Sequence, residues 1–168
     1  YINYSNQTFR IINQTDHSLI LASTTPLKTT HIFSNKTSLY QKNDYNSLFY
    51  YLNNTYYNTL DKTLLLDETW YTGYYNSDNN YDYRKIYDTS VVSKVGLMNV
   101  SDLFVLNIDY SLITPYNKEM ITIIDKDGML KHNKITEKNN IIPTISIKKE
   151  IQIVSGSGTL EDPYVVSE

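Results

Sequence analysis

The chain has 168 residues, of which 40% are hydrophobic and 20% are charged, so it is long and apolar enough to bury a core as one domain. Its formal net charge is −3 and its basic residues are scattered, which argues against nucleic-acid binding because that function needs a basic face. It has no cysteine, which excludes disulfides, zinc–thiolate sites and thiol catalysis.

The start of the sequence indicates an excised or processed piece. The chain begins at Tyr1 without a methionine and shows no signal peptide. It also lacks a run of the roughly 18–20 apolar residues that cross a bilayer. We therefore expect an export signal or anchor before Tyr1, and contact with a membrane only through that missing anchor.

The first part of the chain has strand-like patterns. β-branched and aromatic residues separated by polar turns predict an antiparallel meander over residues 1–4, 8–12 and 18–23. A polar segment around Pro26 predicts a loop over residues 24–43.

The principal helix is predicted at about residues 44–60. Asn43 or Asp44 is suited to cap its N-terminus, and the polar run at 53–55 predicts a break or bend in its interior. The apolar side chains that recur at helical spacing lie near one face: Tyr45, Leu48, Phe49, Leu52, Tyr56 and Leu60.

The remainder is predicted to be mainly β-strand. Gly128 suits the turn of a hairpin at 125–128, and a Gly/Ser/Asp/Pro turn precedes a last short strand near the C-terminus. The predicted strands cover residues 69–75, 95–98, 120–124, 129–132, 143–147 and 151–154. Together these elements predict one α+β domain over residues 1–168, mainly antiparallel sheet with a single principal helix.

Six short segments carry a family resemblance. They are residues 9–12 (Phe-Arg-Ile-Ile), 52–60, 70–73 (Trp-Tyr-Thr-Gly), 95–102, 143–147 and 156–164. In this order they resemble a domain family of exported and surface proteins from low-GC Gram-positive bacteria and their wall-less relatives. Two positions depart from that pattern, because Phe9 stands where the family usually has tryptophan and Ile142 where it has arginine.

The resemblance implies an extracellular location at the cell surface. Members often follow a pilin-like N-terminal helix or belong to wall-attached proteins. We therefore expect a non-catalytic module for assembly or adhesion, with protein or glycan partners at the cell surface and no cofactor. The order of strands and helix is also similar to that of C-type-lectin-like domains.

Metal-binding patterns are sparse in this sequence. The three histidines are not at ligand spacing, and the Asp-x-Asp-Gly segment at 125–128 fits a hairpin turn better than a calcium loop. Asp78, Asn80 and Asp82 lie in the densest oxygen cluster, which we expect to be a plain polar loop; calcium binding by these three residues is the alternative.

Tyrosine is the commonest aromatic residue, with 17 copies against a single tryptophan. In a strand over 69–75, Trp70, Thr72 and Tyr74 would share one face, and Tyr71 and Tyr75 would lie on the other. Since only one face can be core, the other offers a platform for a sugar or a protein. The candidate ligand-binding residues are Tyr71, Tyr75, Tyr81 and Tyr83.

Two alternatives to a plain surface module remain open. The first is a lectin-like glycan binder that uses these tyrosines. The second is a hydrolase, which would need two close carboxylates or a histidine beside a serine. The spacing of the acidic residues singles out no pair among Asp61, Asp67, Glu68, Asp102, Asp109 and Glu119.

Overall fold

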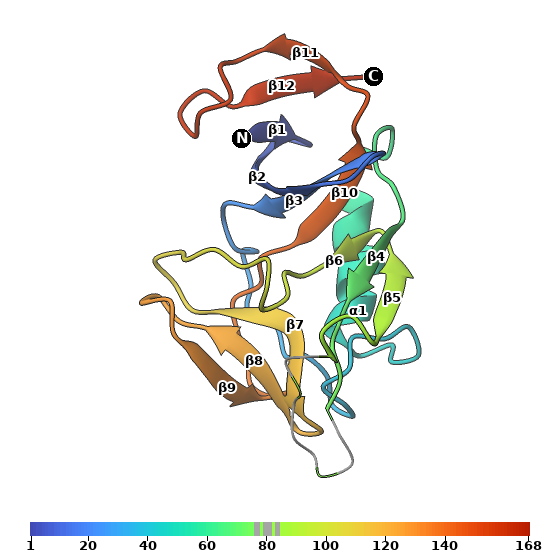
Figure 1. The fold of residues 1–168 in the computed structure, drawn as a ribbon, viewed down its shortest axis with the longest axis vertical. Helices are drawn as coiled ribbons and strands as arrows, with labels where there is room; N and C mark the ends of the chain where they lie inside the picture. Colours follow the sequence, from blue (N-terminus) through green and yellow to red (C-terminus); the bar gives the residue numbers. More distant parts are fainter. Residues whose placement is uncertain (76–77, 79–81, 83–84) are drawn as a thin grey trace.

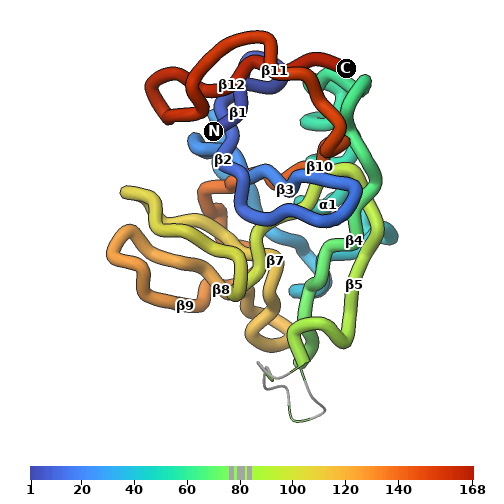
Figure 2. The backbone as a smooth tube through the Cα atoms, turned by 45° about the horizontal axis from the view of Figure 1, so that its top comes forward, coloured from blue at the N-terminus to red at the C-terminus, as the bar shows by residue number. Residues whose placement is uncertain are grey.

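The fold is built on a seven-stranded sheet in which the first and last strands of the chain are neighbours (Figure 1). The computed structural model describes residues 1–75, 78, 82 and 85–168. In spatial order the strands are β11 (Gln152–Ser155), β12 (Tyr164–Ser167), β1 (Ile2–Tyr4), β2 (Gln7–Gln14), β3 (Ser18–Ser23), β10 (Thr144–Lys148) and β6 (Val95–Gly96). Neighbouring strands are antiparallel except β1 and β12, which run parallel and lie side by side in both views (Figures 1 and 2).

Two smaller antiparallel sheets complete the β structure. β4 (Glu68–Tyr71) pairs with β5 (Ser90–Ser93), and β8 (Met120–Ile124) lies between β7 (Tyr110–Asn117) and β9 (Leu130–Lys134). The α+β class, the mainly antiparallel sheet and the single helical segment predicted from the sequence are confirmed. The prediction contained no strand at β7.

The helical segment starts later than predicted. It consists of α1 (Leu48–Tyr50), a π-helical turn η1 (Tyr51–Tyr56) and a 3₁₀ turn η2 (Tyr57–Thr59). The N-cap is Ser47, whose hydroxyl accepts a hydrogen bond from the Tyr50 N–H at 3.3 Å. Asp44 lies three residues before that cap, and its buried carboxylate accepts hydrogen bonds from the Ser34 hydroxyl at 2.6 Å and the Asn46 N–H at 3.1 Å.

The polar run predicted to disturb the helix interior coincides with the π-helical turn. Asn53 reaches across to β6, where its amide accepts from the Val95 N–H at 2.9 Å and donates to the Val95 carbonyl at 3.0 Å. This amide therefore pairs with β6 as a further strand would, and it closes that edge of the large sheet. Asn54 donates to the Tyr50 carbonyl at 3.0 Å, on the exposed side of the turn.

The main core lies between the large sheet and the helical segment. Leu48, Leu52 and Tyr56 pack in one cluster with apolar residues of β1, β2, β3 and β10. A smaller cluster joins Tyr110 and Leu112 of β7 to Met98 and Ile142. In the described part of the chain, no helical segment has the length and hydropathy needed to cross a membrane.

Candidate functional site

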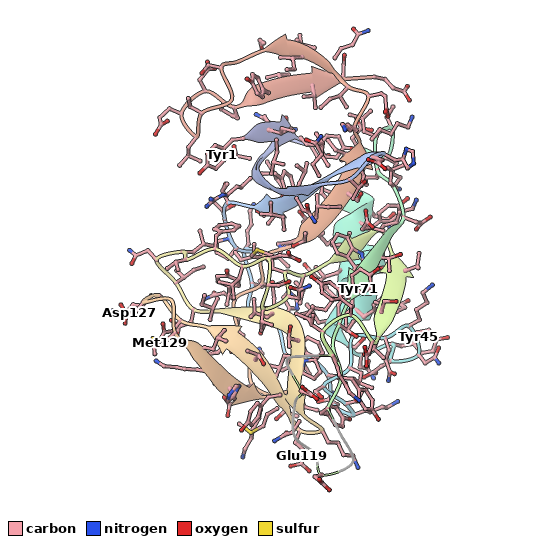
Figure 3. The ribbon with its side chains drawn as sticks, viewed as in Figure 1. Tyr1, Tyr45, Tyr71, Glu119, Asp127 and Met129 are labelled. Atoms are coloured by element: carbon pink, nitrogen blue, oxygen red, sulfur yellow. The ribbon has the colours of Figure 1, made fainter. Side chains whose placement is uncertain are left out.

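Tyr71 is the predicted ligand-binding residue that the structure places at a pocket. It is exposed on β4 (Figure 3). Its ring meets that of Tyr87 edge to face, with the two ring centroids 5.0 Å apart. Its neighbours Trp70 and Thr72 are buried, as alternation along a strand requires. The indole N–H of Trp70 donates to the Ser93 carbonyl at 3.1 Å, which fixes the ring against β5.

The predicted alternation is wrong beyond Thr72. β4 ends at Tyr71, and Gly73 has a φ of +72°, a conformation that turns the chain out of the strand. Tyr74 is consequently exposed rather than on the core face, and its ring stacks on Tyr75 at a centroid distance of 5.6 Å. Tyr75 is half-buried and does not line the pocket described below.

Part of the remaining predicted set falls outside the described residues, namely Tyr81, Tyr83 and Asn80. Asp78 is exposed and Asp82 is half-buried. Within the described ranges, no three histidine or acidic side chains gather as a metal site would require. The plain polar loop expected for this segment, and calcium binding as its alternative, therefore both stay predictions.

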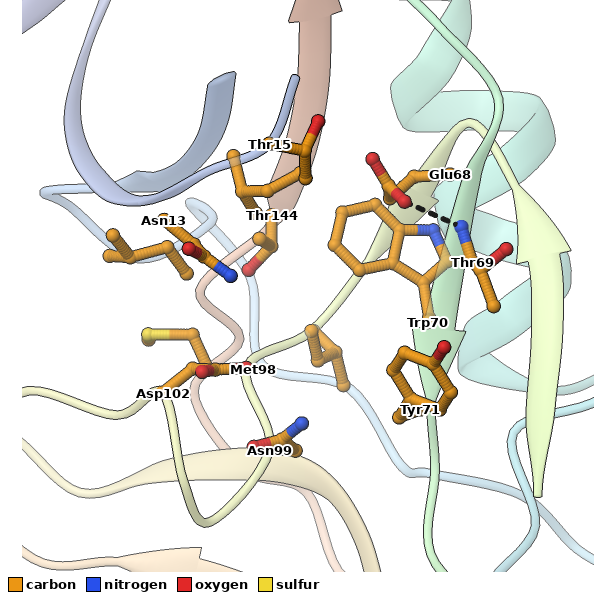
Figure 4. Close-up of a pocket in the computed structure, with 13 residues that line it drawn as sticks. Asn13, Thr15, Glu68, Thr69, Trp70, Tyr71, Met98, Asn99, Asp102 and Thr144 are labelled. Atoms are coloured by element: carbon orange, nitrogen blue, oxygen red, sulfur yellow. Dashed lines mark hydrogen bonds between the residues drawn. The ribbon is translucent and has the colours of Figure 1, made fainter. Parts of the chain in front are cut away.

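A pocket of about 120 Å³ lies beside Trp70, between β4 and the turn between β2 and β3 (Figure 4). The indole forms one wall, and apolar side chains of β2, β3 and the 97–98 segment form the others. The residues that line it are Ile12, Asn13, Thr15, Ile20, Glu68, Thr69, Trp70, Tyr71, Leu97, Met98, Asn99, Asp102 and Thr144.

The position of the indole depends on Gly96 in β6. A Cβ atom added there would lie 2.3 Å from Cδ2 of Trp70, so only glycine lets the ring lie this close to the backbone. The large sheet and the small β4–β5 sheet therefore meet at this contact, which forms the wall of the pocket.

Thr144 provides a polar group in the interior of the pocket. The residue is 1% exposed, and no hydrogen-bond partner for its hydroxyl is found in the described part of the chain. In Figure 4 the hydroxyl oxygen points toward the space enclosed by the lining side chains. A buried hydroxyl without a partner is costly, and a ligand oxygen or nitrogen would provide one if the side chains that cover this oxygen moved aside.

Two carboxylates line the pocket, and their surroundings differ. Glu68 accepts hydrogen bonds from the hydroxyls of Ser18 at 3.2 Å and Ser146 at 2.9 Å, so it ties β4 to β3 and β10. Asp102 is half-buried, and burial raises its pKa above the ordinary value, while hydrogen bonds from Ser101 and Asn99 partly oppose that rise.

The pocket unites segments that are distant in the sequence. Four of the six segments that carry the family resemblance line it: 9–12, 70–73, 95–102 and 143–147. Tyr71 was predicted as a ligand-binding residue, and Glu68 and Asp102 were named only as acidic residues. The predicted site residues did not include Asn13, Thr15, Asn99 or Thr144. Asn99 and Thr144 lie in the segments 95–102 and 143–147, and the order of the six segments was the only signal that could have pointed to them.

Comparison with known proteins finds no family model, curated protein or solved structure that matches this chain. The similarity to C-type-lectin-like domains expected from the order of elements is not confirmed.

Proposed function

We propose that the protein is a non-catalytic module of a bacterial cell surface that acts in adhesion by binding a carbohydrate in the pocket beside Trp70. The observation that carries this proposal is the pairing of an indole wall with the unpartnered, buried hydroxyl of Thr144. Sugar rings present C–H faces that pack on aromatic rings and hydroxyls that need directional partners. The amides of exposed Asn13 and buried Asn99 also line the pocket and add such partners.

The size of the pocket favours a single sugar ring. At the roughly 30 Å³ that one water occupies in the liquid, its volume of about 120 Å³ corresponds to about four waters, which leaves room for no more than one sugar ring. Tyr71 lies at the rim and is 40% exposed, so it can contact the next ring of a longer glycan. The pocket is therefore suited to the end of a glycan chain.

The surface location rests on the resemblance described above. The six segments follow the order found in exported and wall-attached proteins, and four of them build the pocket. A cell-surface glycan is the partner that such a module would meet.

The first experiment uses Trp70, the single tryptophan of the chain, as a reporter. A panel of monosaccharides and cell-wall glycan fragments is titrated while tryptophan fluorescence and heat are recorded. We expect saturable binding of at least one sugar. Thr144→Val should weaken that binding by about threefold to tenfold, because it removes one hydrogen-bonding group from the pocket.

The matched control is Thr122→Val. Thr122 is also fully buried with an unpartnered hydroxyl, but it lies in β8 and does not line the pocket. Both variants make the same chemical change, and only the variant at Thr144 should affect sugar binding. The proposal is wrong if no sugar binds, or if both variants weaken binding equally while their melting temperatures stay unchanged.

The glycans used in this titration should also be tested for hydrolysis, because two carboxylates line the pocket. We assign Glu68 a structural role, since Oε2 of its carboxylate accepts hydrogen bonds from two serine hydroxyls of neighbouring strands. Assays for released reducing ends should therefore give no signal with any glycan that binds. Turnover that Glu68→Gln abolishes would replace the adhesion proposal with a glycosidase.

Assembly is a second candidate function, and the exposed edge of β11 favours it. Ile153 and Val154 in this edge strand are 58% and 64% exposed, and the strand carries no charged residue. The edge strand β9 by contrast contains Lys131 and Lys134, which discourage pairing. An unprotected edge can pair with the same edge of a second copy.

Light scattering over a range of protein concentrations tests this candidate. The wild-type chain should form dimers or longer assemblies at high concentration, and Ile153→Lys should remain monomeric. Val105→Lys changes an equally exposed residue that lies outside the strands, and it should not alter assembly. A monomeric wild-type chain at all concentrations would eliminate assembly through β11.

A further inference from the structure

The charge of the pocket restricts which sugars it can accept. Among the described residues, its lining includes the carboxylates of Glu68 and Asp102 and no lysine, arginine or histidine. A ligand with a carboxylate or sulfate would therefore enter a site of its own sign, without a cation to receive it. A ligand with a positive charge would find two partners of opposite sign.

Asp102 has the environment of a carboxylate that accepts a cation. Of the ion pairs between described residues, none includes Asp102. Arg10 lines a neighbouring hollow together with Asp102, and its guanidinium lies 4.8 Å from the ring centroid of Phe104 in a cation–π contact. Burial penalises the charge of Asp102, and hydrogen bonds from Ser101 and Asn99 offset that penalty only in part. A ligand ammonium would supply the missing counter-charge.

The wall opposite Asp102 suits the same kind of ligand. Figure 4 shows the Trp70 indole on one side of the pocket and Asp102 on the other. An aromatic face attracts both the C–H face of a sugar ring and a nearby ammonium group. A ring that packs on the indole would thus direct its substituents toward Asp102.

We propose that the pocket selects sugars that carry a free, protonated amine, with the ammonium group bound at Asp102 and a hydroxyl bound at Thr144. This inference rests on the proposed carbohydrate binding at the same pocket. N-acetylated sugars lose the charge and gain bulk, and sugar acids reverse the charge, so both classes should bind more weakly.

The experiment compares glucosamine, glucose, N-acetylglucosamine and glucuronate at neutral pH and low salt. We expect the Kd of glucosamine to be at least about tenfold lower than that of glucose, and glucuronate to bind most weakly. Added salt should reduce the preference for glucosamine, because it screens the charge interaction.

Asp102→Asn tests the residue that confers the preference. This variant should lose the preference for glucosamine, so that its Kd values for glucosamine and glucose become similar. Asp127→Asn makes the same change of charge at the exposed tip of the β8–β9 turn, remote from the pocket (Figure 3), and should retain the preference.

The outcomes separate this inference from the function on which it rests. Equal binding of glucose and glucosamine, or a preference that survives in Asp102→Asn, would overturn the amine selectivity and leave carbohydrate binding in place. If none of the four sugars nor any longer glycan binds, both proposals fail.

Discussion

At the scale of single residues, the contact between Gly96 and Trp70 determines the shape of the pocket. Gly96→Ala would place a Cβ atom 2.3 Å from the indole, so the ring must move or the strands must separate. We expect a loss of about 1–3 kcal/mol in the free energy of unfolding and a shifted tryptophan emission spectrum. Urea unfolding followed by fluorescence measures both.

Gly128→Ala is the control for that substitution. Gly128 has a φ of +84°, so alanine is strained there, but the position lies in the β8–β9 turn and its nearest side chain is Val105. This variant should lose stability without any change in tryptophan emission. An unchanged emission spectrum in Gly96→Ala would contradict the tight contact.

The environment of His132 lets us predict how the free energy of unfolding depends on pH. Its ring stacks on Tyr116 at 3.6 Å, its Nδ1 is buried without a partner among the described residues, and burial lowers its pKa below the ordinary 6.5. The unfolded chain therefore binds a proton as the pH falls below 6.5, while the folded chain does not. We expect the free energy of unfolding to decrease over that range.

Substitution identifies the contribution of this ring. His132→Phe should reduce the loss of stability on acidification, as measured by urea unfolding at several pH values. The reduction is partial, because burial also lowers the pKa of His31. A pH dependence in His132→Phe that equals that of the wild-type chain would contradict this role.

At the scale of elements, Asn53 shows how a side chain can replace a strand. Asn53→Ala leaves both the N–H and the carbonyl of Val95 without this partner in the buried edge of β6. We expect a loss of about 2 kcal/mol in the free energy of unfolding. Asn54→Ala removes one exposed hydrogen bond and should cost less than about 0.5 kcal/mol. Equal losses in the two variants would contradict the role given to Asn53.

The elements that the sequence predicted well are those with local signals. The hairpin of β8 and β9 follows from alternation and Gly128, and β3 was predicted with its observed bounds. β7 was missed because Pro115 lies inside it and proline normally interrupts a strand. In the structure β7 is an edge strand, and its register with β8 shifts on both sides of Pro115, which is where a sheet tolerates proline.

The pocket was predictable only in part for a related reason. Alternation along β4 correctly separated exposed Tyr71 from buried Trp70, because that relation is local. The approach of Asp102 and Thr144 to this strand depends on the packing of two sheets, which local periodicity does not encode. The positive φ of Gly73 was also not evident from the pattern, and it moved Tyr74 to the surface.

At the scale of the whole molecule, the pairing of β1 with β12 joins residues more than 150 positions apart. The pairs are Ile2 with Tyr164 and Asn3 with Val165. No turn connects the two strands, and closing so long a loop has an entropic cost that only the complete sheet offsets. Sequence patterns predicted both strands, but the partnership itself could be known only from the structure.

This partnership has a mechanical consequence. The chain enters β1 at one end of the pair and leaves β12 at the other, so tension applied outside these strands pulls them lengthwise past each other (Figure 1). Their hydrogen bonds are then loaded together in shear, whereas a hairpin opened at its end loses its bonds one by one. The protein should therefore require more force to unfold when it is pulled through β1 and β12 than when it is pulled through β1 and Lys126, which lies in the turn between β8 and β9. Because the chain has no cysteine, single introduced cysteines can attach the handles at either pair of points.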